Sequence, residues 1–239
     1  MPSNTSVLPV RSEWPLIQPA GDSALLVTFS RTIDLTTNRL AQALARCLFA
    51  HRLPGFVEAV PGYSTVLVHY DLLALSYPEV EAWVRACLPE ADGESAYPRR
   101  VEIPVRYGGE DGPDLDFVAA HNHLIAADVI RRHSARTYPV FMMGLTPGFP
   151  YLGGLDPAIA APRLATPRSR VPAGSVGIAG EQTGIYPIAS PGGWRIIGRT
   201  PLRLFDPQRD PPFLLEPGDL VCFVPLEIEH GQVINEERG

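Results

Sequence analysis

The first hundred residues alternate between two hydrophobic periods. Short apolar runs bounded by glycine or proline have the pattern of β-strands and occur at residues 23–29, 56–60, 64–70 and 100–105. Two longer segments, residues 36–48 and 78–88, place apolar side chains three or four positions apart, which indicates amphipathic helices. The order of strand, helix, strand, strand, helix and strand predicts a ferredoxin-like βαββαβ domain over residues 14–106.

The pattern changes after residue 107. Two short helical segments come first, at residues 115–120 and 126–133. They are followed by short strand-forming runs divided by glycine and proline, at residues 138–143, 176–179, 184–188, 194–199, 202–204 and 219–223. Many short strands at such spacing predict a closed or nearly closed β-barrel. We therefore expect an α+β protein whose second domain, residues 107–239, is a β-barrel with a helix pair beside it.

Residues 141–218 combine many prolines and glycines with aromatic and β-branched residues. A disordered linker rich in proline and glycine lacks such apolar residues, so here they must fix turns within a packed β structure. Tight turns bring backbone N–H groups together and leave room for a ligand. We expect the binding site of the protein in this tract.

A candidate binding loop lies near the start of this tract. It contains Pro147, Gly148, Phe149 and Tyr151. Proline restricts the backbone, glycine permits close approach or a positive φ, and the two aromatic rings offer faces for packing. A rigid structural corner would use the same residues. The residues alone favour the two interpretations about equally.

A second group of candidates is cationic or polar. Arg168 and Arg170 share one side of an extended segment, and Arg195 and Arg199 share one face of a later strand. Guanidinium groups suit carboxylate or phosphate ligands. Further polar candidates in the same tract are Gln182, Thr183 and Tyr186. The alternative, that the arginines are ordinary solvated surface residues, is slightly favoured by the residues alone.

Proton transfer has one candidate near this tract. His133 is the titratable residue there whose ordinary pKa suits acid–base work near neutral pH. A histidine that contacts the dipole of a helix end is the more common explanation. No nucleophile motif and no acidic cluster for Mg²⁺ accompanies the arginines. A binding tract without reactive groups suggests half of an active site.

Composition narrows the chemistry. All 20 basic residues are arginine, so the chain has no lysine for a phosphate-binding Walker loop, a Schiff base or a general base. Phosphate would have to be held by arginine, backbone N–H groups or another protein chain. The net charge of −6 argues against nucleic-acid binding. Residues 141–205 nevertheless contain six arginines and two acids, a local charge of +4, which favours a local anion site.

Cysteine and histidine spacing predicts no metal site. Cys47, Cys87 and Cys222 are far apart in the sequence and form no CxxC motif, so we interpret them as buried thiols in a reducing compartment. No stretch approaches the roughly 18 apolar residues of a membrane span. We therefore expect a protein without membrane association.

Several long motifs carry a resemblance to a known family. They are residues 147–155 (PGFPYLGGL), 171–180 (VPAGSVGIAG), 182–187 (QTGIYP), 190–194 (SPGGW) and 197–201 (IGRTP), with weaker matches at 21–27, 103–105 and 107–109. These runs resemble the 5-oxoprolinase B-subunit family, whose members are also called KipI-like or allophanate hydrolase subunit 1 proteins. The resemblance covers nearly the whole chain. One departure is Leu145, where the family usually has an aromatic residue.

The resemblance implies a small α/β domain followed by a cyclophilin-like β-barrel. It also implies a bacterial, cytoplasmic protein that pairs with the C-subunit of 5-oxoprolinase and works with its A-subunit. Such an assembly uses ATP, held as Mg-ATP and shared with the partner, to open 5-oxo-L-proline to L-glutamate. Our hypothesis places the four candidate arginines around phosphate or the substrate carboxylate, and Gln182 and Thr183 at the lactam.

Two other functions are compatible with this resemblance. A KipI-like protein inhibits a sensor histidine kinase and catalyses nothing itself. Family members share sequence across both roles, so the chain alone leaves open whether it serves the enzyme or acts as the inhibitor. Prolyl isomerisation by a cyclophilin-like barrel is the weaker possibility, because a fold does not carry a function with it.

Overall fold

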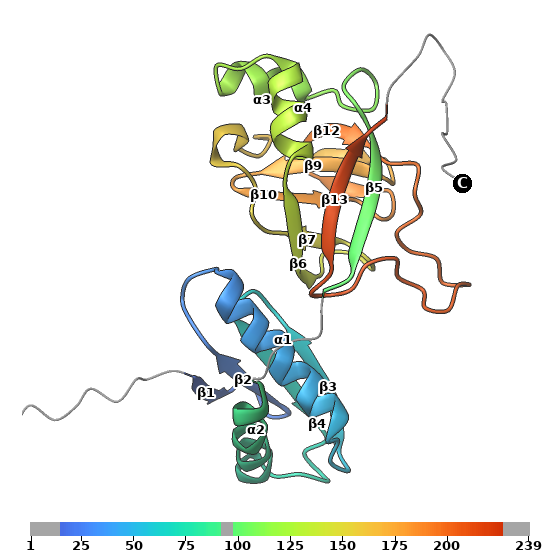
Figure 1. Cartoon of the computed structure of the whole chain (residues 1–239). Helices are drawn as coiled ribbons and strands as arrows, with labels where there is room; N and C mark the ends of the chain where they lie inside the picture. The colour runs from blue at the N-terminus through green and yellow to red at the C-terminus, as the bar shows by residue number, and fades with distance from the viewer. Residues whose placement is uncertain (1–14, 92–97, 227–239) are drawn as a thin grey trace, which may run out of the picture. The chain divides into compact units, whose positions relative to one another are not determined.

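The computed structural model of the chain describes residues 15–91 and 98–226, except for the side chains of residues 89–91. The chain divides into two compact units, residues 1–95 and 96–239, each with a hydrophobic core of its own (Figure 1). The boundary therefore lies earlier than the predicted one after residue 106.

The first unit is an antiparallel sheet covered by two helices. The strands lie in the order β1 (Leu16–Pro19), β2 (Ala24–Thr28), β4 (Thr65–Tyr70) and β3 (Phe56–Pro61). The helices are α1 (Leu35–Ala50) and α2 (Tyr77–Ala91). Both helices contribute buried side chains to the same core as β2, β3 and β4, so they cover one face of the sheet. Every second side chain of β4 is buried, so this strand faces the helices with its apolar positions.

The ferredoxin-like prediction is wrong in its last strand. Residues 100–105 do not join this sheet, because β5 (Arg100–Tyr107) pairs with two strands of the second unit. The place beside β2 is taken by β1, a short and mostly exposed strand that the sequence pattern did not predict. The segment from β2 to α2 has the predicted order of elements.

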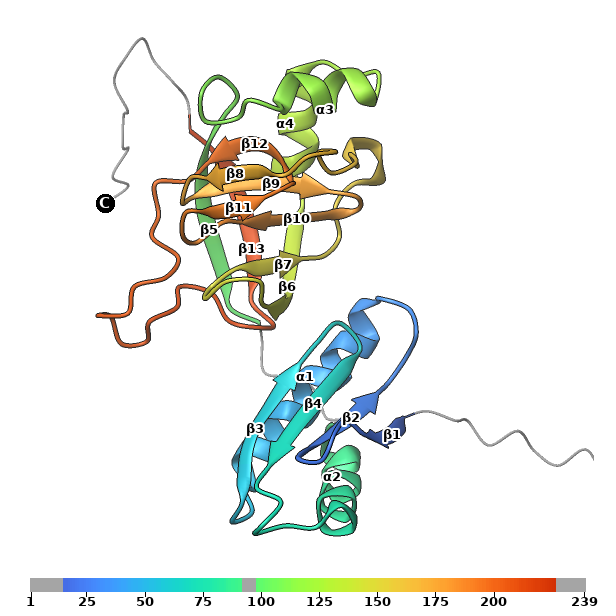
Figure 2. The ribbon, with the colours of Figure 1, turned by 180° about the vertical axis from the view of Figure 1, so that it is seen from behind.

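The second unit is built around a closed barrel, with the strand order β10-β7-β6-β13-β5-β12-β9 (Figure 2). The barrel contains β5 and six further strands, which are β6 (Thr137–Met143), β7 (Pro150–Leu152), β9 (Ser175–Ala179), β10 (Gln182–Ile185), β12 (Arg195–Arg199) and β13 (Leu220–Pro225). The pair of β5 and β13 is parallel, and the other neighbours are antiparallel. A separate antiparallel pair is formed by β8 (Arg168–Val171) and β11 (Ser190–Gly192). The barrel confirms the predicted architecture of this half of the chain.

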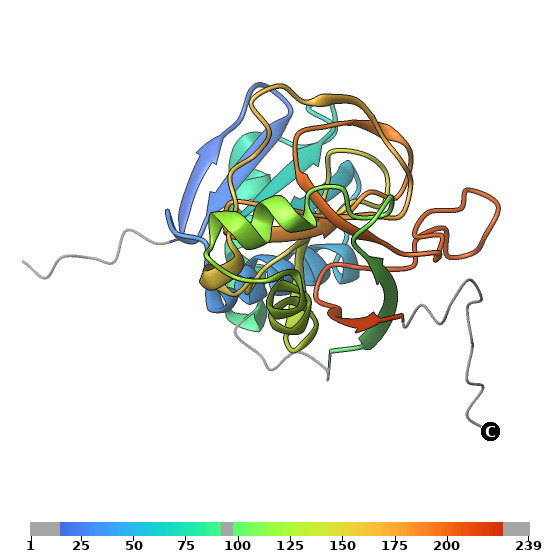
Figure 3. The same cartoon turned by 90° about the horizontal axis from the view of Figure 1, so that it is seen from above.

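Two helices lie over one end of the barrel, α3 (Leu115–His121) and α4 (Ala126–Ser134) (Figures 1 and 3). Their buried side chains, such as Val118 and Val129, belong to the same core as the inward-facing residues of the strands. A 3-10 turn, η1 (Pro157–Ile159), adds the buried Ile159 to it. Among the residues with described positions, no helix is long and apolar enough to cross a bilayer.

One predicted barrel strand is absent from the structure. Residues 202–204 form no strand, and the segment between β12 and β13 extends away from the barrel as a loop (Figure 1). Phe205 and Phe213 hold the base of this loop together through an isolated bridge and stacked rings, whose centroids lie 5.2 Å apart.

Candidate functional site

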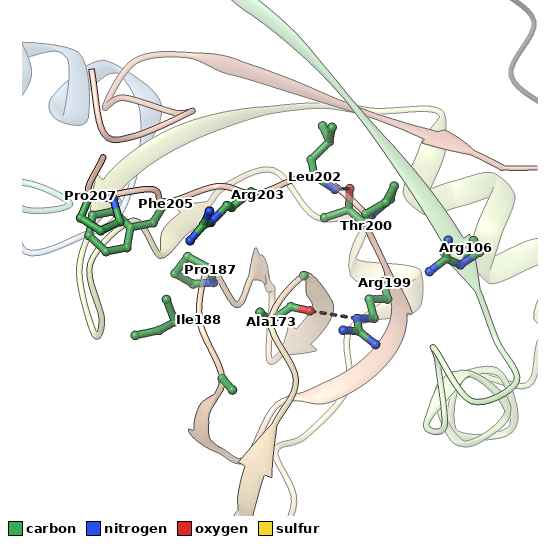
Figure 4. Close-up of a pocket in the computed structure, with 13 residues that line it drawn as sticks. Arg106, Ala173, Pro187, Ile188, Arg199, Thr200, Leu202, Arg203, Phe205 and Pro207 are labelled. Atoms are coloured by element: carbon green, nitrogen blue, oxygen red, sulfur yellow. Dashed lines mark hydrogen bonds between the residues drawn. The ribbon is translucent and has the colours of Figure 1, made fainter. Parts of the chain in front are cut away.

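A pocket of about 580 Å³ lies in the second unit, where the turns after β8, β10 and β12 meet (Figure 4). The 13 residues that line it include Arg106, Arg199 and Arg203 and no acidic residue. In Figure 4 Arg106 and Arg199 lie toward one side of the pocket, and Arg203 lies near Pro187 on the other. Because the rest of the lining is apolar or turn-forming, the guanidinium groups determine which ligands the pocket attracts.

Two of these arginines oppose each other across neighbouring strands. The register of β5 and β12 places Arg106 directly opposite Arg199. Like charges in such a pair repel each other. Asp111 reduces the repulsion, because its carboxylate accepts a hydrogen bond of 2.8 Å from Arg106 Nε and lies 3.9 Å from Arg199 Nη1. An anionic ligand at this place would be attracted by both guanidinium groups.

The orientation of Arg199 is fixed by the backbone. Its Nε donates a hydrogen bond of 2.9 Å to the carbonyl oxygen of Ala173, which is drawn as a dashed line in Figure 4. The side chain is 41% exposed, so a ligand can reach the Nη groups. Arg203 is paired with Asp206 at 3.0 Å and is 68% exposed. Arg106 and Arg199 are therefore the more firmly placed pair.

A glycine turn forms the wall next to Arg199. Gly174 has a φ of +82°, and a Cβ at this position would lie 2.3 Å from the carbonyl oxygen of Thr200. Its N–H donates to the carbonyl oxygen of Tyr186 at 2.7 Å, and its own carbonyl accepts from the N–H of Thr200 at 2.9 Å. These bonds tie the turns after β8, β10 and β12 to one another. Motifs that are distant in the sequence thus form one wall because only glycine fits at their junction.

The predicted binding loop lies behind this pocket wall. Gly148 approaches its neighbours so closely that a Cβ would lie 3.0 Å from Phe205 Cβ and 3.4 Å from Pro187 Cβ. Phe205 and Pro187 are themselves lining residues of the pocket. The adjacent Pro147 is exposed. The loop therefore supports the pocket, and ligand contact by its residues stays a prediction.

The aromatic residues of the motifs form a small core of their own. Phe149 and Tyr186 have no exposed surface, and Trp194 has 3%. The Phe149 ring packs edge-on against Tyr186 and Trp194, with centroids 5.2 and 5.4 Å away, and Tyr151 lies 5.0 Å from it. Burial raises the pKa of the Tyr186 hydroxyl. These contacts are those of a structural corner, in which Tyr186 is covered and does not face a ligand.

Arg168 and Arg195 are directed to a buried carboxylate. Arg168 donates two parallel hydrogen bonds of 2.9 Å to Asp114, and Arg195 Nη1 lies 3.8 Å from the same carboxylate. Asp114 also accepts a hydrogen bond of 2.7 Å from the N–H of Ile196. The Arg195 guanidinium lies 3.5 Å above the ring of Phe117. The hypothesis of one groove lined by four arginines is therefore corrected, since these two arginines hold the start of α3 to β8 and β12.

The remaining polar candidates lie apart from this cluster. Arg170 is exposed on β8 and makes no hydrogen bond or ion pair with the described part of the chain. Gln182 is half-buried at the first position of β10. Thr183, the next residue, is fully buried. The geometry does not bring these residues together around one ligand.

His133 lies in the interior of the second unit, within a directed chain of hydrogen bonds. The Thr183 hydroxyl donates to the carbonyl oxygen of Gly177 at 3.0 Å, so its oxygen accepts from His133 Nε2–H at 2.9 Å. The other ring nitrogen, Nδ1, then accepts from the hydroxyl of Tyr107 at 2.8 Å. The hydroxyl of Tyr138 donates to the backbone carbonyl of His133 at 2.8 Å. Each group in the chain has a partner when the imidazole is neutral.

This environment does not support the predicted acid–base role of His133. The side chain has no exposed surface, and burial lowers its pKa from the ordinary 6.5 to about 3. Burial also raises the pKa of its partner Tyr107. A group that is neutral in the physiological range and closed to solvent is poorly placed to exchange protons with a substrate. His133 is a structural residue of the barrel interior.

Comparison with known proteins shows the family of the chain. The family described as "Carboxyltransferase domain, subdomain C and D" matches residues 15–215. The 5-oxoprolinase B-subunit of Bacillus subtilis is 44% identical over 93% of this chain and 98% of its own length. The chain belongs to the 5-oxoprolinase B-subunit family. The family member of Escherichia coli O157:H7 is 45% identical over 86% of this chain and 93% of its own length.

Solved structures similar to this 5-oxoprolinase family member include longer chains. The crystal structure of TTHA0988 has a TM-score of 0.78 and 41% identity, covering 90% of this chain and 41% of that one. The chain therefore spans about two fifths of the TTHA0988 chain. The urea amidolyase of Lachancea kluyveri is 27% identical over 88% of this chain, which corresponds to 13% of the amidolyase. The same two-unit segment thus recurs within larger proteins.

Two pocket residues of this family member escaped the sequence interpretation. Arg106 lies at the end of β5 and Arg203 follows β12, and neither was among the candidates. Arg203 was present in the count of cationic residues between 141 and 205. Arg106 directly follows the strand motif at residues 103–105, but only the pairing of β5 with β12 brings it to Arg199.

Proposed function

We propose that this chain is the B-subunit of an ATP-dependent 5-oxoprolinase, which acts with the A- and C-subunits to convert 5-oxo-L-proline to L-glutamate. The observation that carries the proposal is the 44% sequence identity to the B. subtilis protein over nearly the full length of both chains. That relative is named as a subunit, and therefore as one part of an assembly. We propose the same for the present chain, and we add ATP as co-substrate and a location in the cytoplasm.

The proposed reaction explains why an anion site is needed. The lactam carbonyl of 5-oxoproline resists attack by water. Transfer of the γ-phosphoryl group of ATP to the lactam oxygen activates the ring carbon, and ADP leaves. Water then adds to this carbon, the C–N bond opens to give the free amine and an acyl phosphate, and a second water releases L-glutamate and phosphate. Negative charge develops on transferred phosphate and must be stabilised.

Arg106 and Arg199 are suited to that stabilisation. They stand opposite each other and are partly balanced by Asp111, so an oxyanion that enters relieves the remaining repulsion. We assign this pair to a phosphate of Mg-ATP or to the carboxylate of 5-oxoproline. Arg203, on the opposite side in Figure 4, would contact the same ligand through its exposed guanidinium.

The pocket alone does not complete the reaction. Its described lining contains no carboxylate, histidine, cysteine or serine that would act as a base or nucleophile. The candidate for proton transfer, His133, is buried in the barrel interior. We therefore propose that the C-subunit supplies the reactive groups and that the isolated chain is inactive.

The test is reconstitution of the chain with the A- and C-subunits, followed by measurement of ATP- and 5-oxoproline-dependent glutamate formation. Loss of a charge-assisted hydrogen bond to the reacting anion costs about 1.5–3 kcal/mol, so Arg199→Gln and Arg106→Gln should each lower kcat/KM by about tenfold to a hundredfold. Arg131→Gln is the matched control, because Arg131 is an exposed arginine of the same unit that also pairs with an aspartate.

Three results would contradict the proposal. They are glutamate formation by the chain alone, full activity of both pocket variants, and an equal loss in the Arg131 variant. The same preparation separates the enzyme from the inhibitor found among KipI-like proteins. A chain that supports no turnover with the A- and C-subunits, but blocks autophosphorylation of a sensor histidine kinase, would replace our proposal.

A further inference from the structure

Two cysteines and a histidine of the first unit converge at the contact between α1 and α2. Cys47 and His51 are one helical turn apart at the end of α1, and Cys87 lies on α2. The two sulfur atoms and one ring nitrogen all lie within 4.8 Å of one another. No disulfide joins these two cysteines. Three soft ligand atoms from two packed helices thus point to one place.

The spacing of these atoms is close to that of a zinc site. In a tetrahedral site with Zn–S near 2.3 Å and Zn–N near 2.0 Å, neighbouring ligand atoms lie about 3.5–3.8 Å apart. Cys47 Sγ lies 3.5 Å from His51 Nδ1. Thiolate and imidazole are the ligands that Zn²⁺ prefers, whereas Mg²⁺ and Ca²⁺ prefer oxygen. Small side-chain movements would bring the third atom to the same spacing.

The surroundings hold the ligands in place and leave one side open. The indole N–H of Trp83, one turn before Cys87, donates to the carbonyl oxygen of His51 at 3.0 Å and so ties α2 to the end of α1. Cys47 and Cys87 are buried, whereas His51 is exposed. An ion would therefore be anchored from inside by sulfur and reached from solvent beside the imidazole. Water would fill the fourth position.

We propose that Cys47, His51 and Cys87 form a Zn²⁺ site that joins α1 to α2. Binding releases the proton of each thiol and places the imidazole proton on Nε2, so that Nδ1 exchanges its present contact of 3.1 Å with the carbonyl oxygen of Cys47 for the ion. The site lies in the first unit and involves none of the pocket residues. It is independent of the proposed 5-oxoprolinase activity.

The experiment uses the full chain, reduced and stripped of metal, with Co²⁺ as a spectroscopic probe and Zn²⁺ as competitor. We expect one equivalent of Co²⁺ to give a thiolate charge-transfer absorption band, which Zn²⁺ abolishes by displacement. Zn²⁺ should also raise the midpoint of thermal unfolding of the first unit. Cys47→Ser and Cys87→Ser should abolish the band.

His51→Gln keeps the test decisive if a buried cysteine variant does not fold, because His51 is exposed. Loss of an outer-sphere partner already weakens metal affinity about 10–100-fold, so loss of this ligand should weaken it by at least about tenfold. Cys222→Ser and His69→Gln, which change a cysteine and a histidine outside the cluster, should bind as the wild type does. Absence of the band in the wild type, an unchanged Co²⁺ affinity in the His51 variant, or a band that persists in both cysteine variants would overturn the proposal.

Discussion

The buried imidazole of His133 predicts that the barrel loses stability in mild acid. Folding lowers the pKa of this side chain from 6.5 to about 3, so the unfolded chain binds a proton below pH 6.5 that the folded chain does not bind. The stabilising contribution of the neutral imidazole is complete above pH 6.5. It decreases as the pH falls from 6.5 toward 3.

The size of the effect follows from the two pKa values. At pH 7 about 24% of an ordinary histidine is protonated, and at pH 5 about 97% is. The free energy of unfolding should therefore fall by about 2 kcal/mol between pH 7 and pH 5 from His133 alone. His133→Gln places an amide in the same interior, where it can donate to Thr183 but cannot take up a proton. This variant should lack that share of the pH dependence.

Urea unfolding monitored by Trp194 fluorescence measures the difference. The chain has three tryptophans, so Trp14→Phe and Trp83→Phe in every sample leave Trp194, which lies in the second unit, as the only indole. The quantity compared is the pH 7 minus pH 5 difference in the free energy of unfolding, with and without His133. Equal differences in the two proteins would refute the argument, because another group would then be responsible for the acid sensitivity.

Two further changes test the structural framework of the site with the same fluorescence assay. Asp114→Asn should lower the free energy of unfolding by about 2 kcal/mol, because Arg168 loses its paired carboxylate while staying partly in contact with solvent. The control is Asp116→Asn at an exposed neighbouring position, which should change the free energy of unfolding by less than about 0.5 kcal/mol. Gly174→Ala should cost about 1–3 kcal/mol, since its φ is +82° and the new Cβ meets the carbonyl of Thr200, and a stability equal to that of the wild type would contradict this close approach.

Local pattern was sufficient for most elements and insufficient for their assignment to a sheet. The strand at residues 100–105 was predicted at nearly the observed place, but a run of alternating apolar residues does not say which strands it will pair with. Ile103 and Val105 of this strand are buried in the barrel core, but this assignment is visible only in the folded structure. β1 had no pattern to detect, because three of its four residues are exposed.

The arginine prediction failed through a local irregularity. Arg195 and Arg199 were expected on one face because strand positions alternate. The pairing of β12 with β9 shifts between Ile196 and Gly198, so an extra residue interrupts the alternation. Arg195 consequently turns to Asp114 and Arg199 to the pocket. A bulge of this kind has no dependable sequence signature.

The local charge of residues 141–205 did not identify the arginines of the pocket, because charges that are close in the sequence are not necessarily close in the folded structure. Residues 141–205 carry a surplus of arginine, but two of these arginines are directed to the single carboxylate of Asp114, which lies before the segment. The cation that completes the pocket, Arg106, comes from before the segment as well. The proposed metal site was hidden for a similar reason. The one-turn spacing of Cys47 and His51 is visible in the sequence, but Cys87 comes close to them only through the packing of α2 on α1. An anion site or a metal site is therefore a property of strand register and helix contact, and segment composition indicates only the residue types from which it is assembled.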